Sequence, residues 1–435
     1  MVSGALKGFA GGRNAMPTPG TIISALDIGS SKICCVIATV VAAKNGEGPT
    51  FRVLGMGTTV SRGINHGAIA NLEDAERSIR LAVDGAERNA RLRIENVHVN
   101  VSGGCPQLFT ATAHVKVNSG VVTQRDLDTA IAAAMGKAAI GSRSIIHISP
   151  RAYAIDGVES DDSPLGLHGQ VLGVEIGILT VESAALRNLR QVIASAHLHP
   201  VNLSLSSLAS ARGVLSPDET ALGAVLIDMG AATTGFVVMR NGKLVDSDSL
   251  PIGGAHVTND IAHGLSTTVA HAERLKTMFG SVLSLGHDDR ELIAVPLLGE
   301  RGVGSVHHVP KSNLTAIIRP RLEETLEMLH HRIFATGAAQ GISRFVMTGG
   351  ASQLQGLREL ASDMFGVAVR IGLPAPLQGL SEAAMTAALA VPVGLLNLSM
   401  MPERHVVVPE AARDALRRAN MGYARRVGSW LREAL

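Results

Sequence analysis

The sequence predicts an α/β protein built from two related lobes, a small inserted unit and a C-terminal amphipathic helix. Three observations favour this fold class. An apolar strand that ends in an Asp and is followed by a turn of small residues occurs twice, at Asp27 and at Asp228. Strand and helix patterns alternate along most of the chain. With 435 residues, the chain also exceeds what one hydrophobic core usually accommodates, so two or more domains are expected.

The composition is that of an ordinary globular protein, with 46% apolar and 17% charged residues. A formal net charge of +2 does not favour a nucleic-acid binder, because such proteins carry strong basic patches. The three cysteines, Cys34, Cys35 and Cys105, form no disulfide framework, which favours a reducing compartment. No apolar run reaches the ~18–20 residues that span a bilayer, since the best candidate, 383–396, is interrupted by proline and glycine.

The first lobe begins after residues 1–20, whose Gly/Pro-rich composition predicts a flexible extension with Met16 as a second candidate start. A helix is expected at 71–90, because its apolar residues fall on one face and its charged residues on the other. Apolar runs separated by turn residues predict strands at 22–26, 33–40 and 52–59.

Residues 93–177 are expected to form a separate small unit. Within it, Thr123 precedes a predicted helix at 126–135 and is a suitable N-cap. The acidic segment "DGVESDDSP" is expected to be a solvated loop rather than a metal site. Strands of this unit are expected at 97–101, 114–117, 145–148 and 171–179.

The chain then returns to the first lobe and afterwards forms the second. The return is predicted as a helix at 186–196, a strand at 201–205 and a helix at 208–215. The second Asp motif starts the second lobe. Its further elements are expected to be a long helix from about 255, a helix over most of 313–340, a strand at 345–347 and a helix at 357–365.

Each Asp motif suits a phosphate or Mg²⁺ site. In "LDIGSSK" and "LIDMGAATTG", small residues let backbone N–H groups approach phosphate oxygens, and hydroxyl groups add donors. The carboxylates are expected to hold a hydrated Mg²⁺, because Mg²⁺ gives up its water reluctantly. Two such turns imply two lobes that grip one polyphosphate from opposite sides. The P-loop pattern GxxxxGK[ST] is absent from the sequence.

Two more segments suit the nucleoside end of such a ligand. In "FVMTGGASQLQGL", a strand runs into Gly349 and Gly350, whose backbone can lie flat against a nucleoside. In "HAERLK", Glu273 and Lys276 are one helical turn apart and can reach one ligand together. The same pair is also typical of a solvated ion pair, and both interpretations stay open.

In order and spacing, these motifs resemble the two phosphate motifs and the adenosine motif of the actin, Hsp70 and sugar-kinase superfamily. Within it, the chain resembles the FtsA family of actin-like bacterial cell-division proteins over residues 21–435. The resemblance implies the actin-like ATPase fold, with two ribonuclease-H-like lobes around a nucleotide cleft. The segments that carry it are "SRGINHGAI", "IIHISPRAYAIDG", "PLGLHG", "SLASARGVL", "LPIGGAHVTNDIAHGLSTTVAHAERLK" and "VGSWLREAL".

The resemblance also implies a division into subdomains. The family has a subdomain 1C in place of actin's 1B, and this corresponds to the inserted unit at 93–177. The remaining assignments are 1A at 21–92 and 178–222, 2A at 223–254 and 338–398, 2B at 255–337, a linker at 399–410 and a terminal helix at 411–435.

By the same resemblance, the cleft binds ATP and Mg²⁺. Asp27 and Asp228 are implied to hold Mg²⁺ through water, and Glu273 and Lys276 to hold the ribose and adenine. The other implied ligand residues are Gly29, Ser30, Ser31 and Lys32 on one side of the phosphates, Gly230, Thr233 and Thr234 on the other, and Gly349 and Gly350 behind the nucleoside.

One pair of residues departs from the family pattern. Where the family usually has Gly-Gly-Gly-Thr after the second Asp, this sequence has Gly230-Ala231-Ala232-Thr233. Two extra β-carbons are expected to crowd a turn in which the backbone approaches phosphate or adopts a positive φ. Nucleotide binding is still expected, whereas tight closure and hydrolysis are expected to be hindered.

The terminal segment 411–435 predicts a basic amphipathic helix that contains the only Trp of the chain. Such a helix suits a membrane interface, because Trp anchors at headgroup depth and Arg attracts anionic lipid. The alternative is a helix that docks onto the protein's own core or onto a partner. The candidate membrane residues are Leu416, Tyr423, Arg425, Arg426, Val427, Trp430, Leu431 and Arg432.

The resemblance implies a structural adaptor with at most weak ATPase activity. It implies homopolymers on the cytoplasmic face of the inner membrane at the division site, FtsZ bound through 2B and later division proteins bound through 1C. One alternative is the pilus-assembly relative PilM. Another is an ATP-dependent sugar kinase, which needs an additional general-base Asp in the cleft. An Hsp70-like chaperone needs more chain after the adenosine motif than is present.

Overall fold

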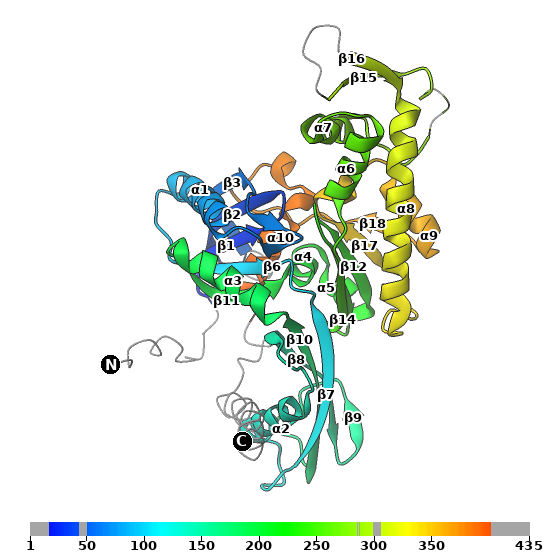
Figure 1. Cartoon of the computed structure of the whole chain (residues 1–435). Coiled ribbons are helices and arrows are strands. Elements are labelled where there is room, and N and C mark those ends of the chain that lie inside the picture. Colours follow the sequence, from blue (N-terminus) through cyan, green and yellow to red (C-terminus); the bar gives the residue numbers. More distant parts are fainter. Residues whose placement is uncertain (1–16, 43–49, 285, 287, 299–305, 402–435) are drawn as a thin grey trace, which may run out of the picture.

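The computed structural model describes residues 17–42, 50–284, 286, 288–298 and 306–401. Figure 1 shows two lobes side by side, each containing a five-stranded sheet, with a smaller unit that projects below them. The predicted α/β architecture of two lobes and an insert is confirmed. Most of the predicted N-terminal extension and the whole predicted helix at 411–435 lie outside the described residues.

The first lobe contains one mixed sheet with helices on both faces. Alternate side chains of its central strands pack against α1 (Leu72–Ala90) and α3 (Ser183–Ser195) on one face. The opposite face packs against α10 (Ala390–Ser399). The strand order is β11 (His199–Leu205), β6 (Asn96–Val101), β1 (Ile22–Ile28), β2 (Lys32–Val41) and β3 (Thr50–Val60), followed in the chain by the small hairpin of β4 (Ile64–Asn65) and β5 (Ala68–Ile69).

The strand that we expected at 97–101 in the inserted unit belongs instead to the first lobe. As β6, it runs parallel to β1, with Ala25 opposite His98, and it lies between β1 and β11. Its valines are buried with α1 and α3 in the first-lobe core. Alternation of apolar residues identifies a strand but not the sheet that the strand joins, so the predicted boundary at residue 93 was wrong.

The inserted unit is a four-stranded antiparallel sheet covered by the helix α2 (Gln124–Lys137). Thr123 is the N-cap of α2, as expected, because its side chain accepts from the Asp126 amide and the Asp126 carboxylate accepts from the Thr123 amide. The strand order is β7 (Gln107–Lys116), β10 (Val171–Val181), β8 (Ser144–Ile155) and β9 (Val158–Ser160).

The second lobe repeats the arrangement of the first around a second mixed sheet. The helix α4 (Ser206–Val214) lies between the lobes, and it is followed by α5 (Pro217–Leu222). α4 packs so closely against α10 that a β-carbon on Gly394 would lie 1.7 Å from the Ala209 carbonyl oxygen. The strand order is β14 (Lys243–Leu250), β13 (Thr234–Arg240), β12 (Ala224–Met229), β17 (Phe345–Thr348) and β18 (Val369–Ile371).

The helix expected from about residue 255 is two helices, α6 (Gly254–Gly264) and α7 (Val269–Phe279). The chain turns at Ser266, which has a positive φ of 48°, and Thr268 then caps α7. The outer part of this lobe also contains a hairpin and two further helices. These are β15 (Leu292–Pro296), β16 (Val306–Pro310), α8 (Lys311–Ala335) and α9 (Leu357–Phe365). Among the described residues, no helix is both long and apolar enough to cross a bilayer.

Candidate functional site

The two Asp motifs form equivalent hairpin turns, one in each lobe. Asp27 lies opposite Cys34 in the β1–β2 hairpin, and Asp228 lies opposite Gly235 in the β12–β13 hairpin. In the first turn the Gly29 amide donates to the Lys32 carbonyl at 3.1 Å. The second turn has the same closure, from the Gly230 amide to the Thr233 carbonyl at 2.9 Å. The sequence repeat therefore corresponds to a repeat in three dimensions.

Glycine is required in both turns. A β-carbon on Gly29 would lie 2.9 Å from the Lys32 carbonyl oxygen, and one on Gly230 would lie 3.0 Å from that of Thr233. A third glycine, Gly349, has a φ of 89° and approaches the second Asp so closely that a β-carbon would lie 2.5 Å from an Asp228 carboxylate oxygen. Small residues at these places let the backbone close around the carboxylates.

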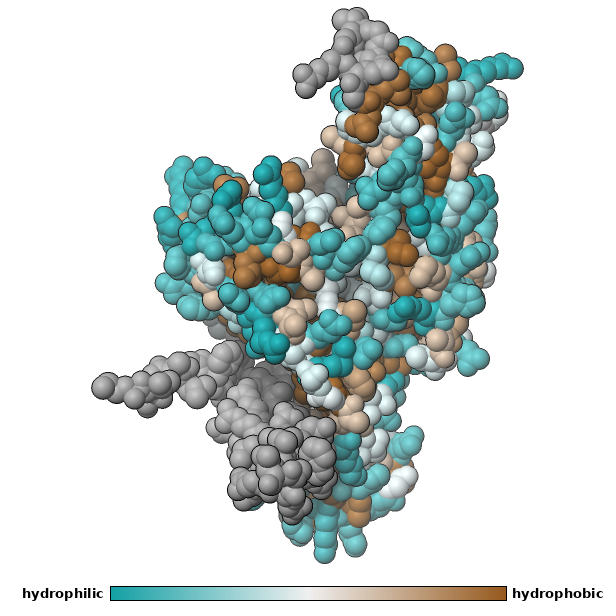
Figure 2. Space-filling model, viewed as in Figure 1, coloured by the Kyte–Doolittle hydropathy of each residue, from teal (hydrophilic) through white to brown (hydrophobic). Residues whose placement is uncertain are grey.

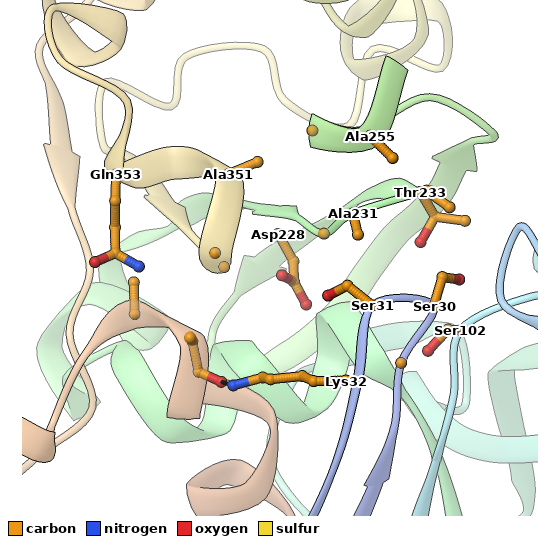
Figure 3. Close-up of a pocket in the computed structure, with 18 of the residues that line it drawn as sticks. Ser30, Ser31, Lys32, Ser102, Asp228, Ala231, Thr233, Ala255, Ala351 and Gln353 are labelled. Atoms are coloured by element: carbon orange, nitrogen blue, oxygen red, sulfur yellow. Dashed lines mark hydrogen bonds between the residues drawn. The ribbon is translucent and has the colours of Figure 1, made fainter. Parts of the chain in front are cut away.

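The two turns face each other across a cavity of about 730 Å³ that both lobes line. Figure 3 shows Ser30, Ser31 and Lys32 on one side of it and Asp228, Ala231 and Thr233 on the other. Every predicted nucleotide residue except Thr234 lines this cavity. Those that do are Asp27, Gly29, Ser30, Ser31, Lys32, Asp228, Gly230, Thr233, Glu273, Lys276, Gly349 and Gly350.

Asp27 lies in a buried network of polar groups beneath the cavity. The Asn100 amide nitrogen donates to the Asp27 carboxylate at 2.8 Å, and its second hydrogen is shared between the hydroxyl oxygens of Ser102 and Ser206, each 3.0 Å away. The Asn100 oxygen accepts from the Ile28 amide at 2.6 Å. Burial raises the pKa of Asp27 to about 7, against the opposing effects of the Lys32 charge and the Asn100 hydrogen bond, while the Asp228 charge raises it further.

Asp228 has a simpler environment. The Ser210 hydroxyl of α4 donates to its carboxylate at 2.7 Å, and both side chains are buried. Burial raises the pKa of Asp228, and the Ser210 hydrogen bond opposes this shift. Two buried carboxylates of like charge that line one cavity favour a bound cation.

Mg²⁺ fits this pair of carboxylates. It prefers oxygen ligands and usually keeps several waters, so two carboxylates are sufficient to hold it. Within the part of the chain that the structure describes, no group of three or more His, Cys, Asp or Glu side chains is placed to bind a metal directly. The Asp27 and Asp228 oxygens are therefore the groups that would hold a hydrated Mg²⁺ beside the phosphates.

Lys32 and Lys276 both line the cavity and bring positive charge to it. The Lys32 ammonium donates to the Ala388 carbonyl at 2.8 Å, on the floor of the cavity (Figure 3). The Lys276 ammonium pairs with Glu273 at 2.7 Å and donates to the Gly254 carbonyl at 2.9 Å and the Thr258 hydroxyl at 2.8 Å. The Lys276 side chain is only 15% exposed, and both Glu273 and Lys276 line the cavity. The two residues therefore form part of the cavity wall in addition to their ion pair.

Thr234 is not placed to bind a ligand in the cavity. Its side chain is fully buried, and its hydroxyl donates to the Ile252 carbonyl at 2.7 Å. Successive side chains of a strand point to opposite faces, so only one of Thr233 and Thr234 can face the phosphates. Thr233 lines the cavity and Thr234 does not, so the prediction for Thr234 is corrected to a structural role.

The alanines after Asp228 do not strain the turn, because neither Ala231 nor Ala232 has a positive φ. Of the two reasons for expecting crowding, the positive φ is therefore absent. The turn is instead fastened to the start of α6, whose Gly254 and Ala255 amides donate to the carbonyls of Gly230 and Ala231. The Ala231 methyl group does line the cavity beside Asp228 (Figure 3), so hindered approach of a phosphate stays a prediction.

Sequence reasoning missed the residues that hold the carboxylates. Asn100 is a polar residue within the otherwise apolar strand "VHVNV", and this contrast is a usable signal. Ser206, Ser207 and Ser210 share one face of α4 at helical spacing, a pattern that is recognisable in "SSLAS" only once the helix is known to border the cavity. No sequence signal indicates that Ser210 reaches Asp228.

Comparisons with known proteins agree with this geometry. The family model described as cell division protein FtsA matches residues 225–391, and the model described as the SHS2 domain inserted in FtsA matches residues 103–180. The cell division protein FtsA of Rhizobium meliloti (strain 1021) is 38% identical over 419 residues, which cover 95% of each chain. The chain belongs to the FtsA family. The cell division protein FtsA of Escherichia coli (strain K12) is 28% identical and covers 95% of this chain and 98% of its own.

Solved structures share the fold of this FtsA family member at lower identity. The PilM–PilN type IV pilus biogenesis complex matches with a TM-score of 0.62 and 17% identity, over 88% of this chain and all of that chain. MreB5 of Spiroplasma citri bound to ADP matches with a TM-score of 0.50 and 13% identity, over 86% and 95% of the two chains. These similarities confirm the actin-like fold. The sequence relatives assign the chain to the FtsA family, whereas the likeness to PilM at 17% identity concerns the fold alone.

Proposed function

We propose that this member of the FtsA family binds ATP and Mg²⁺ in the cavity between its lobes. The observation that carries the proposal is that the predicted ligand residues, which come from four separate segments of the sequence, all line one cavity except Thr234. Asp27 and Asp228 would hold the hydrated Mg²⁺, the two turns would bind the phosphates, and Glu273 and Lys276 would hold the ribose and adenine. The MreB5 structure with ADP shows that a protein of this fold binds an adenine nucleotide.

The ATP-bound protein would act as an adaptor in cell division. Its lobes would form a homopolymer, and the basic helix at 411–435 would hold that polymer on the cytoplasmic face of the inner membrane. The outer part of the second lobe, 2B, would bind FtsZ, and the inserted unit, 1C, would recruit later division proteins. Nucleotide would act by favouring the conformation that it binds best, with at most weak hydrolysis.

The outer part of the second lobe has a surface suited to a protein partner. Figure 2 shows apolar side chains gathered there, next to otherwise polar surface. Exposed apolar patches on soluble proteins often mark contact sites. The exposed side chains of this part include Val269, Leu292, Leu298 and Val306.

The arrangement does not favour a sugar kinase. Among the described residues that line the cavity, the carboxylates are Asp27, Asp228 and Glu273. The first two are the proposed Mg²⁺ residues, and Glu273 is engaged by Lys276 and by the Thr258 hydroxyl. A kinase needs a further carboxylate free to accept a proton from the substrate hydroxyl.

Nucleotide binding is tested by titrating the full-length protein with ATP in the presence and absence of Mg²⁺. Wild type is expected to bind ATP more tightly with Mg²⁺, and Asp228→Asn is expected to lose at least tenfold of that Mg²⁺-dependent affinity, since one of two ionic ligands is removed. Thr234→Ser keeps the hydroxyl outside the cavity and serves as the control. Wild type that ignores ATP would contradict the proposal.

Membrane attachment requires a separate experiment, in which wild type and Trp430→Glu are sedimented with anionic liposomes, with and without ATP and Mg²⁺. Wild type is expected to pellet and to form ATP-dependent filaments visible by electron microscopy, whereas the variant stays in the supernatant. If both proteins remain soluble, the segment 411–435 is a docking helix and the adaptor proposal fails.

A further inference from the structure

The inserted unit is covalently part of the first lobe but packs against the second. The chain leaves the first-lobe sheet after β6 and returns to it through α3 and β11. The base of the unit nevertheless shares a buried core with the second lobe, in which Leu179 of β10 packs with Leu226 and Leu244. Figure 1 shows β14 directly above the unit. A change in the angle between the lobes must therefore move the unit or break these contacts.

Three side chains, Asp161, Asn241 and Lys243, connect the unit to the second lobe, and we call them the insert latch. Asp161 follows β9, Asn241 lies in the β13–β14 turn, and Lys243 is the first residue of β14. The Lys243 ammonium donates to the Asp161 carboxylate at 3.1 Å and to the carbonyl oxygens of Asp161 and Arg151 at 2.8 and 2.7 Å. The Asn241 amide donates to the other Asp161 carboxylate oxygen at 2.8 Å. All three Lys243 donors are thus used by the inserted unit.

The latch is more than a loose surface ion pair. The Lys243 side chain is 21% exposed, and its ammonium lies 5.9 Å from the centre of the Tyr153 ring of β8. The hydrogen bond from Lys243 lowers the pKa of Asp161, so the carboxylate is held in its charged form. Hydrogen bonds from the charged Lys243 ammonium to two backbone carbonyls give the contact a defined geometry.

The turn that carries the latch is fixed to the helices beside it. Asn241 and Gly242 have φ values of 52° and 71°, as in a tight two-residue hairpin turn. Their backbone N–H groups donate to the carbonyls of Ala221 and Thr220 in α5, at 3.1 and 2.8 Å. The Arg212 guanidinium of α4 donates to the Gly242 carbonyl at 3.1 Å. The turn cannot shift without disturbing α4 and α5.

The helix α4 also reaches the cavity. Ser210, half a turn before Arg212, donates to Asp228, and Ser206 and Ser207 line the cavity wall. One short helix therefore contacts a proposed Mg²⁺ carboxylate and the turn that carries the latch. Because a helix of this length moves as a rigid element, a displacement at the Ser210–Asp228 contact is transmitted to the contact between Arg212 and the turn.

We propose that the insert latch couples the orientation of the inserted unit to nucleotide binding, and that it is formed in the conformation that binds nucleotide. The inference rests on the proposed ATP site. It follows from the structure because the latch is formed in the same conformation in which both lobes line one cavity. Since coupling between two events is reciprocal, breaking the latch weakens nucleotide binding, and nucleotide protects the latch.

The first test measures ATP–Mg²⁺ affinity of the full-length protein and of two latch variants. Asp161→Asn keeps the shape of the side chain and removes its charge, and its Kd is expected to rise about two- to fivefold. Lys243→Met keeps the apolar stem and removes all three donors, and its Kd is expected to rise about tenfold. Asp162→Asn is the matched control, because Asp162 lies on the same loop and forms no ion pair within the described residues.

The second test follows hydrogen exchange of the segment 151–162 with and without ATP and Mg²⁺. In wild type, nucleotide is expected to slow exchange of this segment, and in Lys243→Met the response is expected to disappear. Wild-type affinity in folded Lys243→Met, or exchange that ignores bound nucleotide in wild type, overturns the coupling alone. Wild type that binds no nucleotide overturns the proposed ATP site as well, so the two failures are distinguishable.

Discussion

The two Asp turns have the same backbone closure and different surroundings. Around Asp27, the first lobe places Lys32 and the side-chain amide of Asn100, which hydrogen-bonds both to the carboxylate and to the Ile28 amide. Around Asp228, the first lobe places one hydroxyl, that of Ser210, and the second lobe places Gly349 close to the carboxylate. Both carboxylates are buried. The repeated motif therefore specifies where each carboxylate lies, and non-repeated residues decide how its charge is stabilised.

This difference suggests a division of labour between the lobes. The first turn contains the cation Lys32 and suits direct neutralisation of phosphate charge. The second turn contains no basic residue. It is hydrogen-bonded to the start of α6 and lies against the Gly349 segment, and both of these elements line the proposed nucleoside end of the cavity. Substitutions near Asp27 should therefore act mainly through the charge that they remove. Substitutions near Asp228 should act mainly through the steric fit that they disturb.

The largest effect is expected from Asp27→Asn in the absence of nucleotide. The pKa of Asp27 rises from 3.8 to about 7 on folding, so the folded state binds more protons than the unfolded state between these pH values. The contribution of Asp27 to wild-type stability therefore falls as the pH rises through this window and does not change further above it. The neutral amide of the Asp27→Asn variant does not carry the cost of burying an ionised carboxylate. The variant should therefore be more stable than wild type at pH 8, by about 4 kcal/mol at ~1.4 kcal/mol per pKa unit.

Denaturant unfolding of both proteins at several pH values measures this effect. The stability difference should be near zero below pH 4 and should grow until about pH 7. Groups that do not interact with Asp27 titrate alike in both proteins and cancel in the difference, whereas Lys32 and Asp228 interact with it. A difference that does not change between pH 5 and pH 8 would show that burial does not control the charge of Asp27.

The second effect concerns fit around Asp228, and the neighbouring glycines give a matched pair. Gly349→Ala places a β-carbon 2.5 Å from both an Asp228 oxygen and the Met229 carbonyl, at a φ of 89°. Overpacking and backbone strain together should lower the free energy of unfolding by about 3 kcal/mol and abolish ATP binding. A β-carbon on Gly350 meets nothing within 4 Å, so Gly350→Ala should keep nearly wild-type stability. Equal losses in urea unfolding would contradict the proposed role of Gly349.

The sequence was sufficient for much of the site, because the geometry of a strand–turn–strand motif is local. An Asp followed by glycine and small residues after an apolar strand can hardly form anything but a tight turn with an exposed backbone. Both turns and the Gly349–Gly350 segment were identified in this way. The alternation of side chains along a strand would also have separated Thr233 from Thr234, had it been applied to the start of β13.

The remaining features depend on contacts between distant segments. The strand at 96–101 is apolar enough for either sheet, and only its pairing with β1 and β11 decides that it belongs to the first lobe. Asn100 is separated from Asp27 by 73 residues, and Asp161 from Lys243 by 82. Periodicity within one window carries no information about such pairs. Which polar residues support the carboxylates, and which join the insert to the second lobe, therefore required the structure.

The smallest effect separates two serines on one face of α4. Ser210→Ala removes the hydroxyl that donates to Asp228, and it should lower the free energy of unfolding at pH 8 by about 1–2 kcal/mol. Because the hydrogen bond favours the charged carboxylate, its loss raises the pKa of Asp228 further, and the destabilisation should shrink as the pH falls and the carboxyl is protonated.

Ser207→Ala is the control, since the Ser207 hydroxyl is buried and has no hydrogen-bond partner in the described part of the chain. Removing an unsatisfied hydroxyl should be neutral or slightly stabilising at every pH. Urea unfolding of both variants at pH 5 and pH 8 measures the contrast. If Ser210→Ala is as harmless as Ser207→Ala, Asp228 does not depend on the first lobe for its hydrogen bond, and the contact of α4 with the cavity loses its energetic basis.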